Sequence, residues 1–142
     1  MCSAPGPPAT KEASAWDKAV EEQSESHHGI PKKLKDDPAV QDMRKDGFKY
    51  DGEDNRHDVP KRKEDGEVFH ANHPRYTDQI RKFYREQRVK PKWQSAAPGE
   101  LLNFGREFNK WLIGELKASF AQGIKINDIT LDFSTFQPTL FK

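Results

Sequence analysis

The chain has 142 residues, of which 33% are hydrophobic and 33% are charged, and its formal net charge is +1. Soluble domains are on average nearer half apolar and a quarter charged, so this composition favours disorder. The single cysteine excludes an internal disulfide, and no apolar run reaches the roughly 18 to 20 residues of a membrane-spanning helix. The N-terminus has no secretory or lipidation pattern, so we expect an intracellular protein of the cytoplasm or nucleus that is not secreted.

Hydrophobic residues are concentrated toward the C-terminus, because they make up 28 of residues 1–100 and 19 of residues 101–142. We therefore do not expect one fold through the whole chain. The predicted fold class is a mostly irregular, intrinsically disordered chain with helices, a short β segment and no large independent core. We divide it into an extended, largely disordered arm (1–72), a short basic helix and linker (73–94) and a helix–strand docking unit (95–142).

The arm offers little from which to build a core. Residues 1–15 are rich in small residues and proline, which predicts a flexible tail. Between residues 24 and 66, glycine and proline recur and no helical or strand period of apolar residues survives. Isolated hydrophobic residues such as Ile30, Leu34 and Phe48 remain, and we interpret them as small anchors of an extended chain.

The first predicted helix covers about residues 77–88. Thr77 is a suitable N-cap, and the apolar residues Ile80, Phe83 and Tyr84 recur three and four positions apart. These apolar residues form a narrow stripe, which is typical of a helix that buries one side.

The segment 75–93 around this helix is locally basic, and aromatic side chains lie between the basic ones. Such a pattern suits a phosphate backbone with stacked bases, but it suits an acidic protein surface equally well and is also typical of a solvated helix face. The candidate contact residues are Arg81, Lys82, Arg85, Arg88, Lys90, Lys92 and Trp93.

The second predicted helix covers about residues 98–122. Its apolar residues follow spacings of three and four, and Gly123 supplies a C-terminal stop. Two interior glycines, Gly105 and Gly114, each cost about 1 kcal/mol relative to alanine. We nevertheless expect this to be the best-defined element of the chain.

After this helix the apolar period changes to two, which predicts a short β segment over residues 124–134. One helix and one short β segment rarely bury enough surface to be stable alone, so the unit is expected to dock onto a larger protein, with the central aromatic residues as anchors. The alternative is that its apolar residues fill a small core of their own. The predicted partner-binding residues are Phe104, Phe108, Trp111, Leu112, Leu116, Phe120, Ile129, Leu131 and Phe133.

Signals for chemistry are weak. His70 and His73 could place two imidazoles near one ion, with His57 or Asp58 as further ligands, but strong zinc signatures contain two ligand pairs. Cys2 lies in the proline-rich tail, where nothing positions it as a nucleophile. No phosphate-binding or hydrolase motif occurs. We therefore expect no catalytic residue, metal, cofactor or small-molecule substrate.

The sequence as a whole predicts a non-catalytic interaction protein. In this hypothesis it is a small accessory or scaffold subunit that wraps over a larger protein assembly, docks through its aromatic C-terminal unit and folds on binding. The alternative is a nucleic-acid-associated protein, of a ribonucleoprotein or of chromatin, that binds through segment 75–93. Phosphate binding would make the affinity fall steeply with salt, which distinguishes the two.

Overall fold

The computed structural model describes the backbone of residues 11–142 and the side chains of residues 15–142, so most of the predicted flexible tail lies outside the described residues. It contains α-helices, short 3-10 helices (η) and one pair of strands. In chain order these elements are α1 (Lys11–Glu22), β1 (Ser24–His28), η1 (Lys32–Leu34), α2 (Pro38–Lys45), β2 (Arg56–Pro60), α3 (Pro74–Arg88), α4 (Pro91–Gln94), α5 (Glu100–Ala121), η2 (Ile126–Asp128), η3 (Phe133–Thr135) and η4 (Thr139–Phe141).

The two strands form an antiparallel pair in which His27 lies opposite His57. The connection between them is not a tight turn, because it contains η1 and α2. Asp37 begins α2 as its N-cap, since its Oδ1 accepts a hydrogen bond of 3.1 Å from the Ala39 N–H, and Pro38 occupies the first helical position. A folded insertion therefore lies between the two paired strands in the chain.

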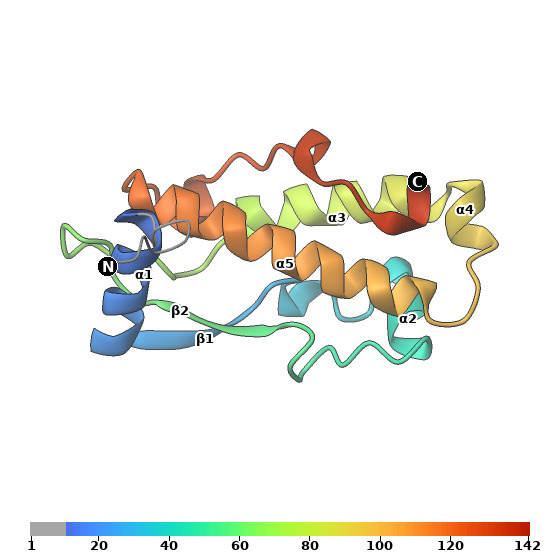
Figure 1. Cartoon of the computed structure of the whole chain (residues 1–142), viewed down its shortest axis with the longest axis horizontal. Coiled ribbons are helices and arrows are strands. Elements are labelled where there is room, and N and C mark those ends of the chain that lie inside the picture. The colour runs from blue at the N-terminus through green and yellow to red at the C-terminus, as the bar shows by residue number, and fades with distance from the viewer. Residues whose placement is uncertain (1–10) are drawn as a thin grey trace, which may run out of the picture.

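The longest helix, α5, runs along the molecule beside α3, with the strand pair and α2 on its other side (Figure 1). At one end α1 packs against α5 through Trp16, whose ring lies edge-on to Phe69 and Phe120 at centroid distances of 5.9 and 5.8 Å. Such aromatic pairs contribute about 0.5–1.5 kcal/mol beyond their buried area. The loop after β2, α1 and α5 are thus held together by one aromatic group.

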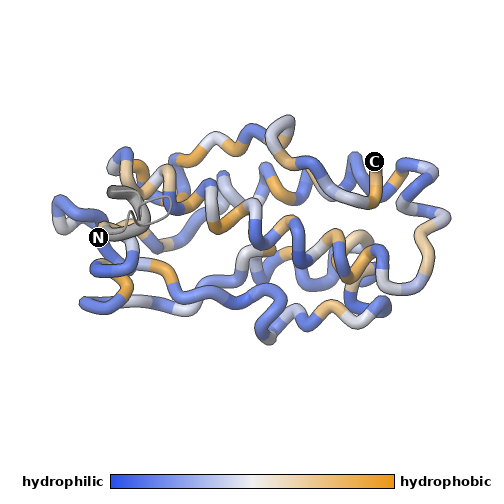
Figure 2. Tube along the Cα trace, viewed as in Figure 1, coloured by the Kyte–Doolittle hydropathy of each residue, from blue (hydrophilic) through white to orange (hydrophobic). Residues whose placement is uncertain are grey.

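The prediction of a mostly disordered chain without a large core is wrong, because one hydrophobic cluster includes residues from α1 to the C-terminal segment. Ile30, Leu34 and Phe48, expected to anchor an extended arm, are 0%, 2% and 3% exposed. Along the chain, short hydrophobic stretches alternate with hydrophilic ones (Figure 2). The core is therefore assembled from sparse residues that are almost completely buried, which no local average of composition detects.

Both predicted helices are present with somewhat different bounds. α3 begins at Pro74 and ends at Arg88, so Thr77 lies inside the helix and its hydroxyl donates to the His73 carbonyl oxygen at 3.1 Å. α5 ends just before Gly123, whose φ is +74°. None of the helices in the described part of the chain is both long and apolar enough to cross a membrane.

The predicted β segment at 124–134 is wrong, because this stretch contains η2, the start of η3 and extended chain without strand pairing. Its backbone is bonded instead to side chains of α3. The Ile129 carbonyl accepts from Arg75 Nη1 at 2.7 Å and from Gln79 Nε2 at 2.8 Å, and Gln79 Oε1 accepts from the Leu131 N–H at 2.8 Å. The alternating pattern thus marks an extended segment that lies on a helix.

Two glycines of α5 are expected to respond oppositely to alanine. A Cβ at Gly105 would lie 2.6 Å from the Phe48 ring, whereas nothing lies within 4 Å of a Cβ at Gly114. Gly105→Ala should therefore destabilise the fold by about 1–3 kcal/mol, and Gly114→Ala should stabilise it by about 0.5–1 kcal/mol. Denaturant unfolding of the two variants measures both; equal effects would contradict the packing of Phe48 on α5.

Candidate active site

Three segments that are distant in sequence meet beside the N-terminal end of α3: the end of β1, the start of β2 and the loop that leads into the helix. His27 from β1 and His70 and His73 from the loop place their ligand atoms within 4.8 Å of one another. The ring centroid of His27 lies 5.0 Å from that of His70 and 5.2 Å from that of His73. We call these three residues the histidine cluster.

The state of His27 follows from its partner on α3. The Tyr76 hydroxyl donates to the Gly29 carbonyl at 2.7 Å, so its oxygen can only accept from His27 Nε2, which lies 3.2 Å away. The other ring nitrogen, Nδ1, is buried without a hydrogen-bond partner among the described residues. Burial, followed by the charges of neighbouring histidines, holds the pKa of His27 well below its ordinary value. His27 is therefore a neutral imidazole with a bare lone pair on Nδ1, the form that binds metals.

The other two rings of the histidine cluster are also oriented from outside it. His70 Nδ1 lies 3.0 Å from Glu25 Oε1, and this hydrogen bond is the main cause that lowers the Glu25 pKa. His73 Nδ1 lies 3.5 Å from the Thr77 hydroxyl, and burial is the main cause that lowers the His73 pKa. An outer carboxylate or hydroxyl on one nitrogen leaves the other available, which is the usual support of a metal-binding histidine. The three residues thus fit a divalent metal.

The sequence suggests that His70 and His73 pair, but with His57 or Asp58 as the further ligands, so His27 was not expected at this site. His57 is instead hydrogen-bonded to α5, and Asp58 is exposed. His27 is separated from His70 by the whole insertion and β2, so no local sequence pattern links the two residues. Only the folded arrangement brings them together. The adjacent pair His27-His28 was visible in the sequence, but two neighbouring histidines alone indicate no chemistry.

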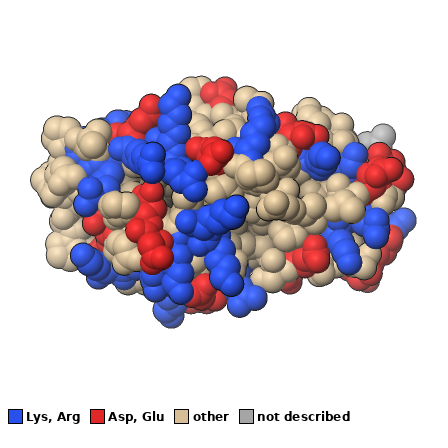
Figure 3. All heavy atoms as spheres, turned by 180° about the vertical axis from the view of Figure 1, so that it is seen from behind, with Lys and Arg blue, Asp and Glu red and all other residues tan. Residues whose placement is uncertain are grey.

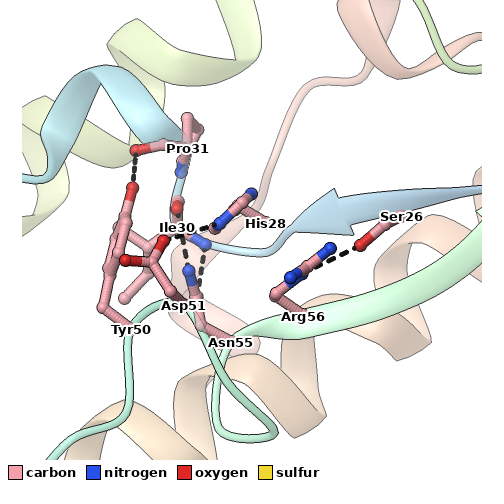
Figure 4. A network of polar contacts seen from close by, with 8 residues as sticks. All are labelled: Ser26, His28, Ile30, Pro31, Tyr50, Asp51, Asn55 and Arg56. Atoms are coloured by element: carbon pink, nitrogen blue, oxygen red, sulfur yellow. Dashed lines mark hydrogen bonds and ion pairs between the residues drawn. The ribbon is translucent and has the colours of Figure 1, made fainter.

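His28 lies next to the histidine cluster in the chain, at the end of β1. Its Nε2 lies 3.2 Å from Asp51 Oδ1, and its side chain is 21% exposed. The hydrogen bond from His28 is the main cause that lowers the Asp51 pKa. The imidazole packs on the Tyr50 ring at a centroid distance of 5.4 Å, and the Tyr50 hydroxyl donates to the Pro31 carbonyl at 2.6 Å (Figure 4). His28 is thus a partly exposed imidazole paired with a carboxylate.

Asn55 fixes the chain that follows His28. Its side-chain Oδ1 accepts from the Ile30 N–H at 2.8 Å and its Nδ2 donates to the Ile30 carbonyl at 3.0 Å (Figure 4). The Asn55 carbonyl also accepts from the Gly29 N–H at 2.8 Å. Asn55 is completely buried, so these bonds have no competition from water.

A second asparagine, Asn109, supports the same turn from α5. Its Nδ2 donates to the Gly105 carbonyl at 3.0 Å, so its Oδ1 accepts from His57 Nε2 at 2.8 Å. A Cβ at Gly29 would lie 2.0 Å from this oxygen. Only glycine therefore allows β1 to leave the sheet this close to α5.

The residues predicted to bind a partner protein lie inside the molecule. Seven of them are buried, and Trp111 and Phe133 are partly buried. Phe133 stacks on Phe83 at a centroid distance of 4.4 Å, and Trp111 Nε1 donates to the Thr135 hydroxyl at 2.9 Å. These contacts hold α5, α3 and the C-terminal segment together. The seven are Phe104, Phe108, Leu112, Leu116, Phe120, Ile129 and Leu131.

The predicted contact residues of segment 75–93 differ in exposure. Trp93 is 2% exposed, and its Nε1 and Arg88 Nε both donate to Asp42 Oδ2 at 2.9 Å, so Trp93 cannot stack on a base. Arg81 pairs with Asp78, and Lys90 Nζ lies 4.4 Å from the centre of the Phe141 ring. The other three, Lys82, Arg85 and Lys92, are exposed and form no ion pair among the described residues.

Comparison with known families gives one match. Residues 10–95 match the model of AHH, described as a nuclease family of the HNH/ENDO VII superfamily with conserved AHH. The only adjacent histidines of the chain, His27 and His28, lie in this region and follow Ser26. Searches of curated proteins and of solved structures found no match.

The close approach of Gly29 to Asn109 predicts coupled substitutions. Gly29→Ala should destabilise the protein by about 1–3 kcal/mol, because its methyl group meets the Asn109 amide. Asn109→Ala removes that group, so the double variant should be more stable than the sum of the two single losses, by about 0.5–3 kcal/mol. A double-mutant cycle of unfolding free energies measures this, and strictly additive losses would show that the two positions do not touch.

Proposed function

Because the chain belongs to the AHH nuclease family of the HNH/ENDO VII superfamily, we propose that it hydrolyses phosphodiester bonds of nucleic acid at the site described above. The observation that carries this proposal is the histidine cluster with His28 beside it, since both lie within the matched region. The family match covers residues 10–95, more than half of the chain.

Membership of a nuclease family overturns the hypothesis of a non-catalytic accessory or scaffold subunit. The prediction that the chain is no enzyme is wrong for the same reason. An active site needs a rigid pocket, and the composition of the chain concealed the core that provides one. Nucleic acid, the alternative partner in the sequence analysis, is compatible with a nuclease domain.

The histidine cluster is the proposed site of a divalent metal ion, which would polarise a phosphate oxygen and stabilise the charge that develops during cleavage. Three imidazole nitrogens suit zinc, nickel and related ions better than calcium or magnesium, which prefer oxygen. Tyr76 and Glu25 orient two of the rings through the nitrogens that face away from the cluster. Their role is to hold the lone pairs in place before the ion arrives.

His28 is the proposed general base. Asp51 accepts from Nε2, so the lone pair on Nδ1 can take the proton of an attacking water. Asp51 then stabilises the imidazolium, as a carboxylate does for a catalytic histidine in hydrolases. Asn55 keeps the backbone after His28 fixed, so that the ring does not move as its charge changes.

Removing one ligand of the histidine cluster should weaken metal binding without unfolding the protein. His73→Ala is suitable, because this residue is only partly buried, and we expect Zn²⁺ or Ni²⁺ affinity to fall by more than about tenfold. Isothermal titration with each ion measures the loss. His28→Ala serves as the control and should bind metal normally; an unchanged affinity in His73→Ala would remove His73 from the site.

Removing the proposed base should leave the affinity for metal unchanged but strongly lower kcat. We expect His28→Ala to lower kcat by about 10²–10⁴, and Asp51→Asn to lower it less, because the Asp51 side chain is 59% exposed. Cleavage of labelled DNA and RNA is measured with Zn²⁺, Ni²⁺, Mn²⁺ and Mg²⁺. Full activity in His28→Ala would exclude this residue as the base, and no cleavage by the wild-type protein with any ion would refute the proposed function.

A further inference from the structure

A recess of about 360 Å³ opens beside the histidine cluster, at the N-terminal end of α3. One side is lined by Lys32 and Lys33 of η1, and the other includes His73, which also belongs to the cluster, and Thr77. We call it the lysine recess. Because His73 contributes to both places, a group bound in the recess lies next to the proposed reaction centre.

The two lysines bring charge that nothing in the described part of the chain neutralises. Both are exposed, and neither forms an ion pair or a hydrogen bond through its ammonium group. The nearest acids along the chain are otherwise engaged, since Asp37 caps α2 and Asp36 accepts from Gln41 at 3.4 Å. No aspartate or glutamate lines the recess. It is therefore a small anion-attracting site.

The N-terminal end of α3 adds positive electrostatic potential to the recess, but the first two residues of the helix offer no free N–H group to an anion. The helix dipole places partial positive charge at that end. Pro74 has no N–H, and the Arg75 N–H donates to Asn127 Oδ1 at 3.0 Å. The ammonium groups of Lys32 and Lys33, rather than the helix backbone, are thus the donors that an anion would meet.

Another basic hollow among the described residues is less suitable. On the outer side of α3, Arg81, Lys82 and Arg85 line a hollow together with Asp78 and Glu86, so its charges largely cancel. Lys and Arg side chains gather near the middle of the face seen in Figure 3, but Asp and Glu are interspersed among them. No acidic side chain lines the lysine recess, whereas the hollow on α3 and the hollow lined by Arg44, Lys45 and Lys49 each include at least one acidic residue.

We propose that the lysine recess binds the phosphate that neighbours the cleaved one in a nucleic-acid strand, with Lys32 and Lys33 as its ligands. This inference rests on the proposed function, because the neighbouring phosphate is defined by cleavage at the histidine cluster. Lysine is suited to this contact, since it acts as a point charge toward phosphate and requires no fixed geometry. The recess then sets the register of the strand, while the chemistry occurs at His28 and the cluster.

The experiment compares two charge-matched variants: Lys32→Gln with Lys33→Gln in the recess, and Lys82→Gln with Arg85→Gln on the outer side of α3. Binding of a fluorescent oligonucleotide is measured by anisotropy in EDTA, where no cleavage occurs, across a salt series. Losing the contact with one phosphate should lower the slope of log affinity against log salt by about 0.7 to 0.9 in the recess variant only. Cleavage with the active metal should then show a raised KM and an unchanged kcat.

The outcomes separate this inference from the proposed function. A loss of binding confined to the recess variant supports phosphate binding by Lys32 and Lys33, whether or not the wild-type protein cleaves. Absence of cleavage refutes the proposed function, and with it the assignment of that phosphate as the neighbour of the cleaved one. An equal loss in both variants, or a loss only in the α3 variant, overturns the inference about the lysine recess. Neither result contradicts the proposed cleavage at the histidine cluster. A lowered kcat at saturating substrate also overturns the inference, because a contact with a phosphate that does not react, made equally in the ground state and the transition state, should affect KM alone.

Discussion

The buried side chain of Asn55 is the contact on which the rest of the site depends. It satisfies both the N–H and the carbonyl of Ile30, directly after β1 ends. A buried amide with both groups bonded fixes the backbone in one position, whereas losing one partner would leave a polar group unsatisfied at a cost of about 1–3 kcal/mol. Because His27 and His28 immediately precede this turn, their directions are set by Asn55.

The matched region does not hold this turn by itself. α5 lies outside residues 10–95, yet its Asn109 accepts from His57 and lies directly over Gly29. The same helix receives Phe48 at Gly105, so the insertion between the strands is packed on it as well. The C-terminal third of the chain, interpreted from sequence as a docking unit, thus serves as the internal support of the site.

The sequence allowed the two long helices to be predicted, because their apolar residues repeat locally at helical spacing. It did not reveal the core, since Ile30, Leu34 and Phe48 are isolated in the sequence and gain meaning only when they meet α3 and α5. The β segment was mistaken because extended chain has the same alternation whether its partner is a strand or, as at Ile129, the side chains of a helix. The site escaped for a related reason: His27 joins His70 and His73 only through the pairing of distant segments.

The histidine cluster has a consequence for folding as well as for chemistry. An ion held there would link β1 to the loop before α3 and so close a loop formed by the chain between residues 27 and 70. The unfolded state does not have this link. A ligand that binds only the folded form stabilises it in proportion to the logarithm of its concentration over its Kd. The free energy of unfolding of this protein would then rise with the supply of metal in its surroundings, and chelation would remove activity and lower conformational stability together.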